Sequence, residues 1–518
     1  MALPFLKSAG TSVLKMGKKI LPGLVSDVVG GKRKWSESLK HRGTAALMDV
    51  LEEREEPRPP KSHVLQGREK GETSIIMMRR DACECSKAQL DLFTVPPVST
   101  SVQEGQWIRY SPLAPPSVAG PLQFNISNPV NAYIDLKQCY LRVCLRVTKD
   151  DGTDTVLADN PVSTVNNVMH SLFREVRLQV RHNQLEITPS MGTYPYRAYL
   201  ETLLSYGTGA KTSHLRCPGW FTDDAGKMDV FNPDADANTR NTGVRTRRDL
   251  IVPTKEVELT GRLHCDLFLQ DRYLLDGVPM KLELLRSPDE FFFMCAADGA
   301  YKLALTKAEF YVRQLNIDPA VRETHVSSLN AGVTAKYPLS RVHVTAHDIP
   351  RGGRDFHKDH LIGGQLPKRV VLGLVDNSAY VGSKEKNPYN FKHNHVTMMK
   401  LKVNGQEVHG TEMKSDFSNN SANLKQVYMN LFRNTGQLWR PETCELTPKA
   451  FTQGYTLWVV DLTPDLGADE GINYPRHTGK LALEIQFGQA LEDPATLICY
   501  EEYENVLEID RFRNAMMV

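Results

Sequence analysis

Two distant segments of this chain repeat one pattern, and that repeat is the feature that most constrains the fold. In Tyr196 to Gly209, apolar residues fall at i, i+3, i+4, i+7 and i+8, the spacing of one helix face. Leu424 to Gly436 repeats this spacing. Each segment stops at a Thr-Gly pair, Thr208-Gly209 or Thr435-Gly436, and we expect the glycine to end each helix in the left-handed conformation. The apolar positions are Tyr196, Tyr199, Leu200, Leu203 and Leu204 in the first segment and Leu424, Val427, Tyr428, Leu431 and Phe432 in the second.

A strand, a turn and a second strand are predicted ahead of each helix. Glu175 to Arg181 alternates apolar and polar residues, and His182-Asn183 follows as a turn. Met399 to Val403 alternates in the same way and leads into Asn404-Gly405. Asn-Gly is a strong hairpin signal because both residues accept the positive φ of a type I′ turn. Both regions therefore predict strand, turn, strand and helix in the same order.

The similarity continues downstream of both helices. Residues 280–286 resemble 480–486, and 308–318 align without gaps on 500–510. Because the elements recur in the same order, we infer a duplicated β-rich domain. The alternative is chance similarity between two amphipathic segments. The identical pairs in the gapless alignment are Glu309/Glu501, Tyr311/Tyr503, Leu315/Leu507, Ile317/Ile509 and Asp318/Asp510.

The rest of the body also has the pattern of strands. From Tyr133 to Val147, apolar residues alternate with polar ones, as in a sheet with one buried face. Further strands are predicted at 257–269, 280–285, 301–317, 341–349, 368–376, 455–462, 480–487 and 496–509. Short strands, many turns and one recurring helix indicate sandwich or jelly-roll domains.

One long polar stretch, Lys211 to Pro253, shows little periodicity and is predicted to be a surface loop. Its "RTRR" at 245–248 could be a contact or a protease-sensitive site, but an exposed loop without a role is the favoured interpretation.

The N-terminal region differs from the body in charge. Residues 1–42 hold nine Lys and Arg against two acidic residues, a charge of +7, whereas the whole chain carries +2. The basic residues expected to contact DNA or a membrane surface are Lys15, Lys18, Lys19, Lys32, Arg33, Lys34, Lys40 and Arg42. A solvated flexible arm with no such contact is the alternative. Pro57, Pro59 and Pro60 then indicate an extended linker.

Composition places the rest of the chain among globular proteins. Hydrophobic residues make up 41% and charged residues 24%, enough to bury a sizeable core. Nine cysteines without regular spacing suit a reduced, intracellular chain. Without a run of 18 apolar residues, we expect no stable membrane insertion.

No reactive constellation is evident in the sequence. His343 and His347 have the spacing of a zinc helix but lie in a predicted strand, where they would be about 13 Å apart. "HKDH" at 357–360 and "HNH" at 393–395 could chelate a metal, as could "CEC" at 83–85, but surface histidines and an unpaired Cys motif are favoured. A phosphate loop and a nucleophile elbow are both missing. We therefore expect no catalytic residues, no metal and no cofactor.

Several stretches resemble the double jelly-roll major capsid (hexon-like) proteins of Polinton/Maverick elements and adintoviruses. In the second half they are 364–377, 386–393, 454–466 and 505–513, and in the first half 90–97, 170–180 and 194–207. Together they cover about residues 88 to 513.

The resemblance implies an all-β double jelly roll: an arm and Pro-rich linker at 1–85, a first jelly roll at 86–319 and a second at 320–518. It also implies a homotrimeric, pseudo-hexagonal capsomer in an icosahedral shell around double-stranded DNA. In such a shell, the charge asymmetry of the chain predicts that the arm points inward, towards packaged DNA or a neighbouring capsomer. Implied partners are other copies of the chain and a penton-like or minor capsid protein. The expected location is the virion, with assembly inside the cell and the host nucleus as one candidate site.

Three other functions stay open at this point. The chain could be a penton-like or minor capsid protein, which would lack the internal repeat. It could be a cellular carbohydrate- or peptide-binding β-sandwich, since jelly rolls also serve as lectins. A capsid-maturation protease or other hydrolase would need a Cys/His or metal cluster that the sequence does not display.

Overall fold

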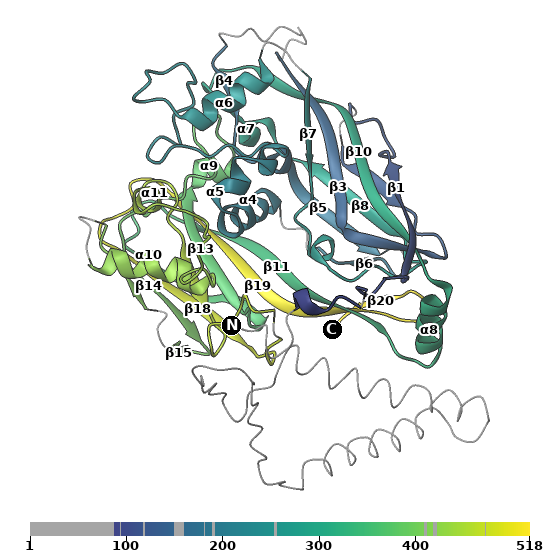
Figure 1. Cartoon of the computed structure of the whole chain (residues 1–518). Helices are drawn as coiled ribbons and strands as arrows, with labels where there is room; N and C mark the ends of the chain where they lie inside the picture. The colour runs from purple at the N-terminus through teal and green to yellow at the C-terminus, as the bar shows by residue number, and fades with distance from the viewer. Residues whose placement is uncertain are drawn as a thin grey trace, which may run out of the picture. The chain divides into compact units, whose positions relative to one another are not determined.

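The computed structural model of the chain describes residues 88–93, 95–117, 120–149, 160–180, 182–188, 192–252, 256–408, 412–417, 422–471 and 473–518. The chain divides into two compact units, Met1–Val95 and Pro96–Val518. In the first unit the structure describes one 3-10 turn, η1 (Ala88–Leu90), and the exposed side chains around it. The elements that follow belong to the second unit (Figure 1).

Two antiparallel sheets form the first half of this second unit. One sheet has the strand order β1-β10-β3-β7 and the other has the order β2-β8-β5-β6. Their bounds are β1 (Val102–Tyr110), β2 (Leu122–Ile126), β3 (Ala132–Lys149), β5 (Phe173–Val180), β6 (Leu185–Glu186), β7 (Val257–Gly261), β8 (Met280–Arg286) and β10 (Tyr301–Ile317). The two sheets pack face to face, since the rings of Phe310 on β10 and Phe124 on β2 lie 6.1 Å apart.

Two further sheets form the second half. The first has the order β11-β19-β13-β17, with β20 beside β19, and the other has the order β12-β18-β14-β15, with β16 beside β14. Their bounds are β11 (Ala335–Ile349), β12 (Asp355–Gln365), β13 (Arg369–Asp376), β14 (Val396–Val403), β15 (Gln406–Glu407), β16 (Met413–Lys414), β17 (Trp458–Asp461), β18 (Thr478–Phe487), β19 (Ala495–Ile509) and β20 (Ala515–Met517). A separate two-stranded sheet pairs β4 (Val162–Thr164) with β9 (Phe293–Cys295).

The strand orders of the two halves correspond strand by strand. β1, β10, β3 and β7 take the places of β11, β19, β13 and β17, and β2, β8, β5 and β6 take those of β12, β18, β14 and β15. The segments matched in sequence fall on corresponding strands: 280–286 on β8 and 480–486 on β18, 308–318 ending β10 and 500–510 ending β19. The inferred duplication is therefore present in the topology.

The helices lie in the connections between strands. α4 (Tyr194–Ser205) and α10 (Ala422–Asn434) follow the hairpins β5-β6 and β14-β15, as predicted. The other helices are α3 (Val168–Ser171), α5 (Thr208–Lys211), α6 (Thr242–Ile251), α7 (Asp289–Phe292), α8 (Pro319–Asn330), α9 (Asn377–Val381), α11 (Pro448–Thr452), and the 3-10 turns η2 (His214–Arg216) and η3 (Asp266–Leu269). In the β14-β15 turn, Asn404 and Gly405 have φ of 51° and 80°, which confirms the hairpin prediction.

The two helix ends differ, although both segments carry Thr-Gly. Gly436, with φ of 69°, follows α10 in the left-handed region, as predicted, and a Cβ there would collide with Asp469. The prediction for Gly209 is wrong: α4 already ends at Ser205, and Gly209 lies inside α5. Extended backbone at Tyr206 and Gly207 separates α4 from α5.

The predicted surface loop at 211–253 is also wrong in its second part. Residues Thr242–Ile251 form α6, with Asn241 as its N-cap, accepting a hydrogen bond from the N–H of Gly243. Arg247 and Arg248 of the "RTRR" motif are buried in this helix. Arg247 and Arg248 therefore have a structural role, because a buried guanidinium needs fixed hydrogen-bond partners.

Each of the two hydrophobic cores contains side chains from both halves of the chain. The second core includes Tyr196, Leu200 and Leu204 of α4, although α4 belongs to the first half. The first core includes Tyr337 and Leu507 from the second half. Figure 1 shows α4 between β5 on one side and β11 and β13 on the other. Each side chain so buried contributes about 1.5–3 kcal/mol, so the border itself is a source of stability.

Among the described residues, none of the helices has the length and apolar composition needed to cross a membrane.

Candidate functional site

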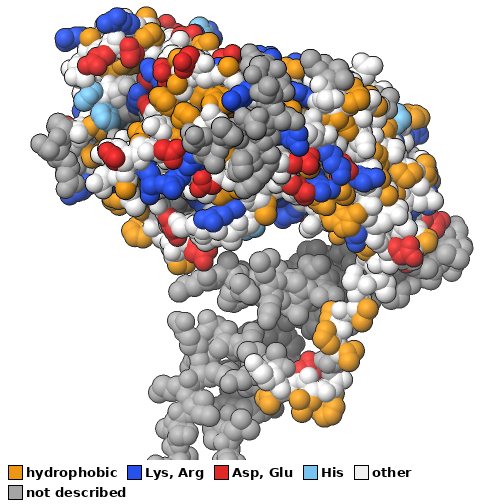
Figure 2. Space-filling view, turned by 90° about the horizontal axis from the view of Figure 1, so that it is seen from above, with side chains coloured by type: hydrophobic (Ala, Val, Ile, Leu, Met, Phe, Trp, Pro, Cys, Tyr) orange, Lys and Arg blue, Asp and Glu red, His pale blue; other side chains and the backbone are white. Residues whose placement is uncertain are grey.

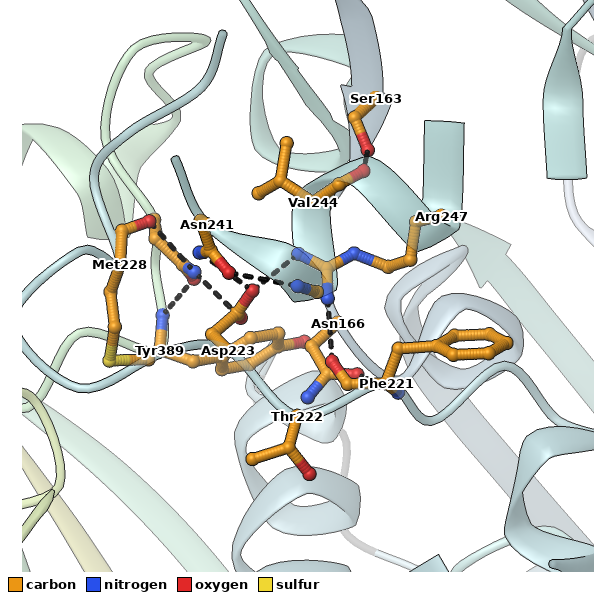
Figure 3. A network of polar contacts seen from close by, with 12 residues as sticks. Ser163, Asn166, Phe221, Thr222, Asp223, Met228, Asn241, Val244, Arg247 and Tyr389 are labelled. Carbon is orange, nitrogen blue, oxygen red and sulfur yellow. Dashed lines mark hydrogen bonds and ion pairs between the residues drawn. The ribbon is translucent and has the colours of Figure 1, made fainter. Parts of the chain in front are cut away.

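A buried ion pair lies at the centre of a polar network where the first half meets the second (Figure 3). Arg247 of α6 donates from Nη2 to Asp223 Oδ1 at 2.7 Å, and both side chains are fully buried. Its Nε and Nη1 donate to the carbonyls of Thr164 and Phe221, each at 2.7 Å. All three guanidinium nitrogens are thus used, which is the condition under which a buried charge is tolerated.

Asp223 connects this network to the second half. Its Oδ2 accepts a hydrogen bond from Nδ2 of Asn387 at 3.0 Å, and its backbone carbonyl accepts one from the Tyr455 hydroxyl at 2.6 Å. Oδ1 also accepts from Asn241, the N-cap of α6. Helix α6, the 220–229 segment and two loops of the second half therefore meet at one residue, Asp223.

Aromatic stacking reinforces the same junction. The rings of Tyr199 on α4 and Tyr389 in the second half lie 4.1 Å apart and nearly parallel, at 3°. The Tyr389 hydroxyl lies 2.5 Å from the hydroxyl of Ser171. Stacked aromatic pairs contribute about 0.5–1.5 kcal/mol beyond their burial, so this contact strengthens the border between the halves.

A second polar cluster surrounds α4 where it meets β11 and β19. Arg197 donates to Asp266 Oδ1 at 2.6 Å and to Glu201 Oε1 at 2.8 Å. Glu201 also lies 2.5 Å from His264 Nδ1 and accepts a hydrogen bond from Tyr500 of β19 at 3.4 Å. The backbone N–H of Val342 on the edge of β11 donates to Asp266. This cluster satisfies polar groups on an edge strand that would otherwise be unpaired.

The charges in this second cluster are fixed by its geometry. Burial opposes ionisation of Glu201, but Arg197 and the hydrogen bond from His264 more than offset it and lower the pKa to about 2. Burial lowers the pKa of neighbouring His170 well below its usual value of 6.5, and the nearby His264 adds to this effect. At neutral pH Glu201 is thus ionised and His170 is neutral.

The C-terminal tail is attached to the first half by a third buried carboxylate, Asp276. Arg513 donates to Asp276 Oδ1 at 2.7 Å and to its backbone carbonyl at 2.7 Å. Arg322 of α8 pairs with Oδ2 at 3.3 Å, and the N–H of Asn131 donates to the same oxygen. The tail, α8 and the loop before β3 therefore meet at one residue.

The histidines singled out in the sequence do not assemble into a metal centre among the described residues. His343 and His347 lie on the predicted strand, β11. His393 and His395 have ring centroids 4.8 Å apart, but His393 stacks on Phe417 at 4.3 Å. No group of three or more His, Cys, Asp and Glu side chains in the described part of the chain could hold a metal ion.

His357 and His360 lie on β12. His357 Nε2 lies 3.2 Å from Asp355, a partner that the sequence pattern did not single out. The eight basic residues of the arm, from Lys15 to Arg42, and the "CEC" motif lie outside the described residues.

The arrangement of these three clusters holds the halves together, and each charge has an opposite charge beside it. Sequence reasoning missed Arg247, although a signal was present: Asn241 is a good N-cap, and Val244, Arg247 and Ile251 follow at helical spacing. Asp223, Asp266 and Asp276 could not be found in this way, because their partners come from distant segments.

Comparison with known proteins gives a distant sequence relative and several structural neighbours. No protein-family model matches the chain. The uncharacterized protein F54H12.2 of Caenorhabditis elegans is 25% identical over 436 residues, which cover 82% of this chain and 99% of that protein. A chain of the Sputnik virophage, solved by cryo-EM, matches with a TM-score of 0.57 and 12% identity over 85% of this chain and 93% of its own. A chain of the PBCV-1 virus capsid matches with a TM-score of 0.51 and 11% identity over 82% of this chain and 99% of its own.

At such low identities the structural matches bear on the fold. Together with the paired sheets of each half, they show that the body of the chain is a double jelly roll. The predicted fold class, all-β with short helices in the connections, is confirmed for the described residues.

Proposed function

We propose that this chain is a major capsid protein, and that three copies form a pseudo-hexagonal capsomer of an icosahedral particle. The observation that carries the proposal is the repeated strand order: β1-β10-β3-β7 and β11-β19-β13-β17 are two equivalent sheets in one chain. Two similar lobes per chain give six similar lobes in a trimer. The matches to chains of the Sputnik virophage and the PBCV-1 capsid support the same role.

The three buried clusters fit this role because a capsomer lattice needs lobes with a fixed mutual orientation. Asp223, through Asn387, and Asp276, through Arg513, each join segments of different halves. Within the proposal, the arm is 1–85, the first jelly roll 86–319 and the second 320–518. The role is structural and involves no reaction, so no catalytic residue, metal or cofactor enters it.

The source of such a particle is part of the proposal. The sequence resemblance favours a Polinton/Maverick element or an adintovirus, with double-stranded DNA as the packaged genome. The proposed partners are other copies of the chain in the lattice and a penton-like or minor capsid protein. The chain would reside in the virion after assembly inside the cell, with the host nucleus as one site.

The proposed DNA contact rests on the arm and not on the body. Residues 1–42 carry +7, so the remainder of the chain carries about −5. On the face of the molecule in Figure 2, Lys and Arg side chains are interspersed with Asp and Glu, so they form no single basic surface there. The arm therefore is the segment that we expect to face packaged DNA.

The mass of the purified full-length protein tests the proposal. Light scattering coupled to size exclusion should give three times the chain mass of 58.3 kDa. A stable monomer or dimer would contradict it and would favour the cellular ligand-binding sandwich or a minor capsid role, since neither needs a closed trimer.

A further inference from the structure

The two equivalent sheets differ in how they are covered. In the second half, every residue of the central strand β13 from Val370 to Asp376 is buried, so both faces of the β11-β19-β13-β17 sheet are covered along that strand. In the first half, Tyr140 and Arg142 on the counterpart strand β3 are only half-buried, and Trp107 on the edge strand β1 is 45% exposed. One face of the first sheet is therefore open to solvent where the corresponding sheet of the second half is not.

The residues that cover the β11-β19-β13-β17 sheet come from the first half of the same chain. Val344, Tyr500 and Val371 lie opposite one another on β11, β19 and β13, so their side chains share one face. Leu200 and Leu204 of α4 line one cavity together with Val371 and Tyr500. On the opposite face, Trp458 meets Phe417 near the other sheet of the same half, with ring centroids 6.4 Å apart. Helix α4 thus occupies the outer face of the second sheet.

The open face of the first sheet carries an aromatic row. Trp107 packs edge-on against Tyr140 with ring centroids 5.3 Å apart, and Tyr140 stacks on Tyr311 at 4.8 Å and 8°. Phe310, the neighbour of Tyr311 in sequence, points the other way, into the first core. Three large rings therefore lie in contact on a surface where solvent reaches them.

Arginines frame this row and are already held in place. Arg313 lies over the Trp107 ring, 5.5 Å from its centroid. Arg109 pairs with Glu309 at 3.3 Å, and Arg142 bridges Glu309 at 3.1 Å and Glu258 at 2.6 Å. Trp, Tyr and Arg are the residues that dominate the energetics of protein interfaces, and side chains fixed in advance lose little entropy on binding.

We propose that this aromatic–arginine face, made of Trp107, Arg109, Tyr140, Arg142, Tyr311 and Arg313, binds the second half of another copy of this chain. Within one copy, α4 of the first half covers the outer face of the β11-β19-β13-β17 sheet. In the proposed contact, the second half of one copy covers the outer face of the β1-β10-β3-β7 sheet of another copy in the same way. The inference rests on the proposed trimer and adds which surfaces meet in it.

The repeat favours a head-to-tail contact over a self-contact of the face. In each chain the β11-β19-β13-β17 sheet is covered and the equivalent β1-β10-β3-β7 sheet is open. If the second half of the next copy covers the open sheet, first and second halves alternate around a closed ring. The second half offers α10, the counterpart of α4, followed by Trp439, which is 89% exposed. We place Trp439 on the partner's side of this contact.

A photo-crosslinking amino acid at position 107 tests the contact directly. Full-length protein carrying it is mixed with heavy-isotope wild-type protein, irradiated and digested, and the mixed-isotope crosslinks are mapped by mass spectrometry. The expected partners lie within residues 320–518 of the other copy, near Trp439. Crosslinks confined to β1, β3 and β10 of the other copy, or no crosslinks between copies, would overturn the inference.

A charge substitution tests the same surface without a probe. Trp107→Glu combined with Arg313→Glu is expected to give a monomer at concentrations where the wild type is a trimer, with an unchanged circular dichroism spectrum. Val130→Glu places a single negative charge on another exposed apolar site of the first half and should remain a trimer. A trimeric double variant would overturn the inference and leave the proposed function standing, whereas a monomeric wild type would overturn both.

Discussion

Removing the Arg247 guanidinium should destabilise the protein more than any comparable change on α6. In Arg247→Met the side chain keeps similar length, but Asp223 loses its charged partner, and the carbonyls of Thr164 and Phe221 lose their donor. Removing one member of a buried ion pair costs about 3–5 kcal/mol, because the other charge stays buried without compensation.

The expected size can be converted into a melting temperature. For a cooperative unit of about 420 residues, the entropy of unfolding is about 0.9 kcal/mol/K, so the loss corresponds to about 3–6 °C. Scanning calorimetry of the full chain measures it. The control is Arg245→Met, a half-buried arginine on the same helix, which should change stability by about 0.5 kcal/mol or less.

A double substitution separates the ion pair from simple loss of packing. Asp223→Asn removes the charge that Arg247 neutralises, and in the double variant no unpaired charge remains buried. The double variant should therefore lose about 1–3 kcal/mol less than the sum of the two single variants. If Arg247→Met melts within about 1 °C of Arg245→Met, or if the two losses simply add, the Arg247–Asp223 ion pair does not stabilise the network as described.

Three further predictions follow from the fold and the proposed function. Gly436→Ala should destabilise the protein by about 1–3 kcal/mol in urea titrations, because Gly436 has a positive φ. Gly209→Ala lies inside a helix and faces open space, so it should be neutral or slightly stabilising. Equal effects of the two substitutions would refute this prediction. His170 is buried and His343 is half-buried, and this desolvation lowers the pKa of His170 well below 6.5 and that of His343 to about 4. The unfolded chain then binds more protons below pH 6.5, so stability should be fully present above pH 6.5 and fall by about 1.4 kcal/mol per pH unit for each histidine as the pH drops towards 4; a flat profile there would contradict it. Deleting residues 1–60 should lower the DNA content and salt sensitivity of assembled particles, and unchanged values would remove the arm from the proposal.

Local patterns in the sequence predicted most of the long strands and their order, but not β1, β2 or β12, and the strand predicted at 257–269 ends at Gly261 because Asp266–Leu269 forms a 3-10 turn. The alternation in Tyr133 to Val147 predicted β3, and the Asn404-Gly405 pair predicted the β14-β15 hairpin. Both predictions were possible because strand pleating and turn dihedrals depend on neighbouring residues. The repeat of these elements then implied two equivalent sheet pairs. These features do not require knowledge of distant contacts.

The gapless alignment of the two halves matched the right strands but not the right faces. Tyr311 donates to Glu309 at 3.0 Å, and Tyr503 donates to Glu501 at 2.7 Å, so the identical residues make the same hydrogen bond. Tyr311 and Glu309 lie on the open face of their sheet. The equivalent Tyr503 and Glu501 lie on the face that points away from α4, because Glu501 follows Tyr500, whose side chain faces α4. A shift of one residue moves a side chain to the other face, and sequence similarity alone does not register it.

The partners of the apolar helix faces were also beyond the sequence. Tyr199 and Leu203 of α4 were matched to Val427 and Leu431 of α10, but the α4 residues pack into the second half, whereas the α10 residues pack into their own. Helical spacing shows that a face is buried but not against which sheet. For the same reason, the acidic partner of Arg247 could not be assigned before the fold was known.

Imaging of the purified full-length protein by cryo-electron microscopy tests the central claim most directly. The account predicts particles with threefold symmetry and six similar lobes in top view, in which lobes from the first and second halves alternate around the ring. Single two-lobed particles, or dimers with twofold symmetry, would contradict the proposal that this chain builds a capsomer.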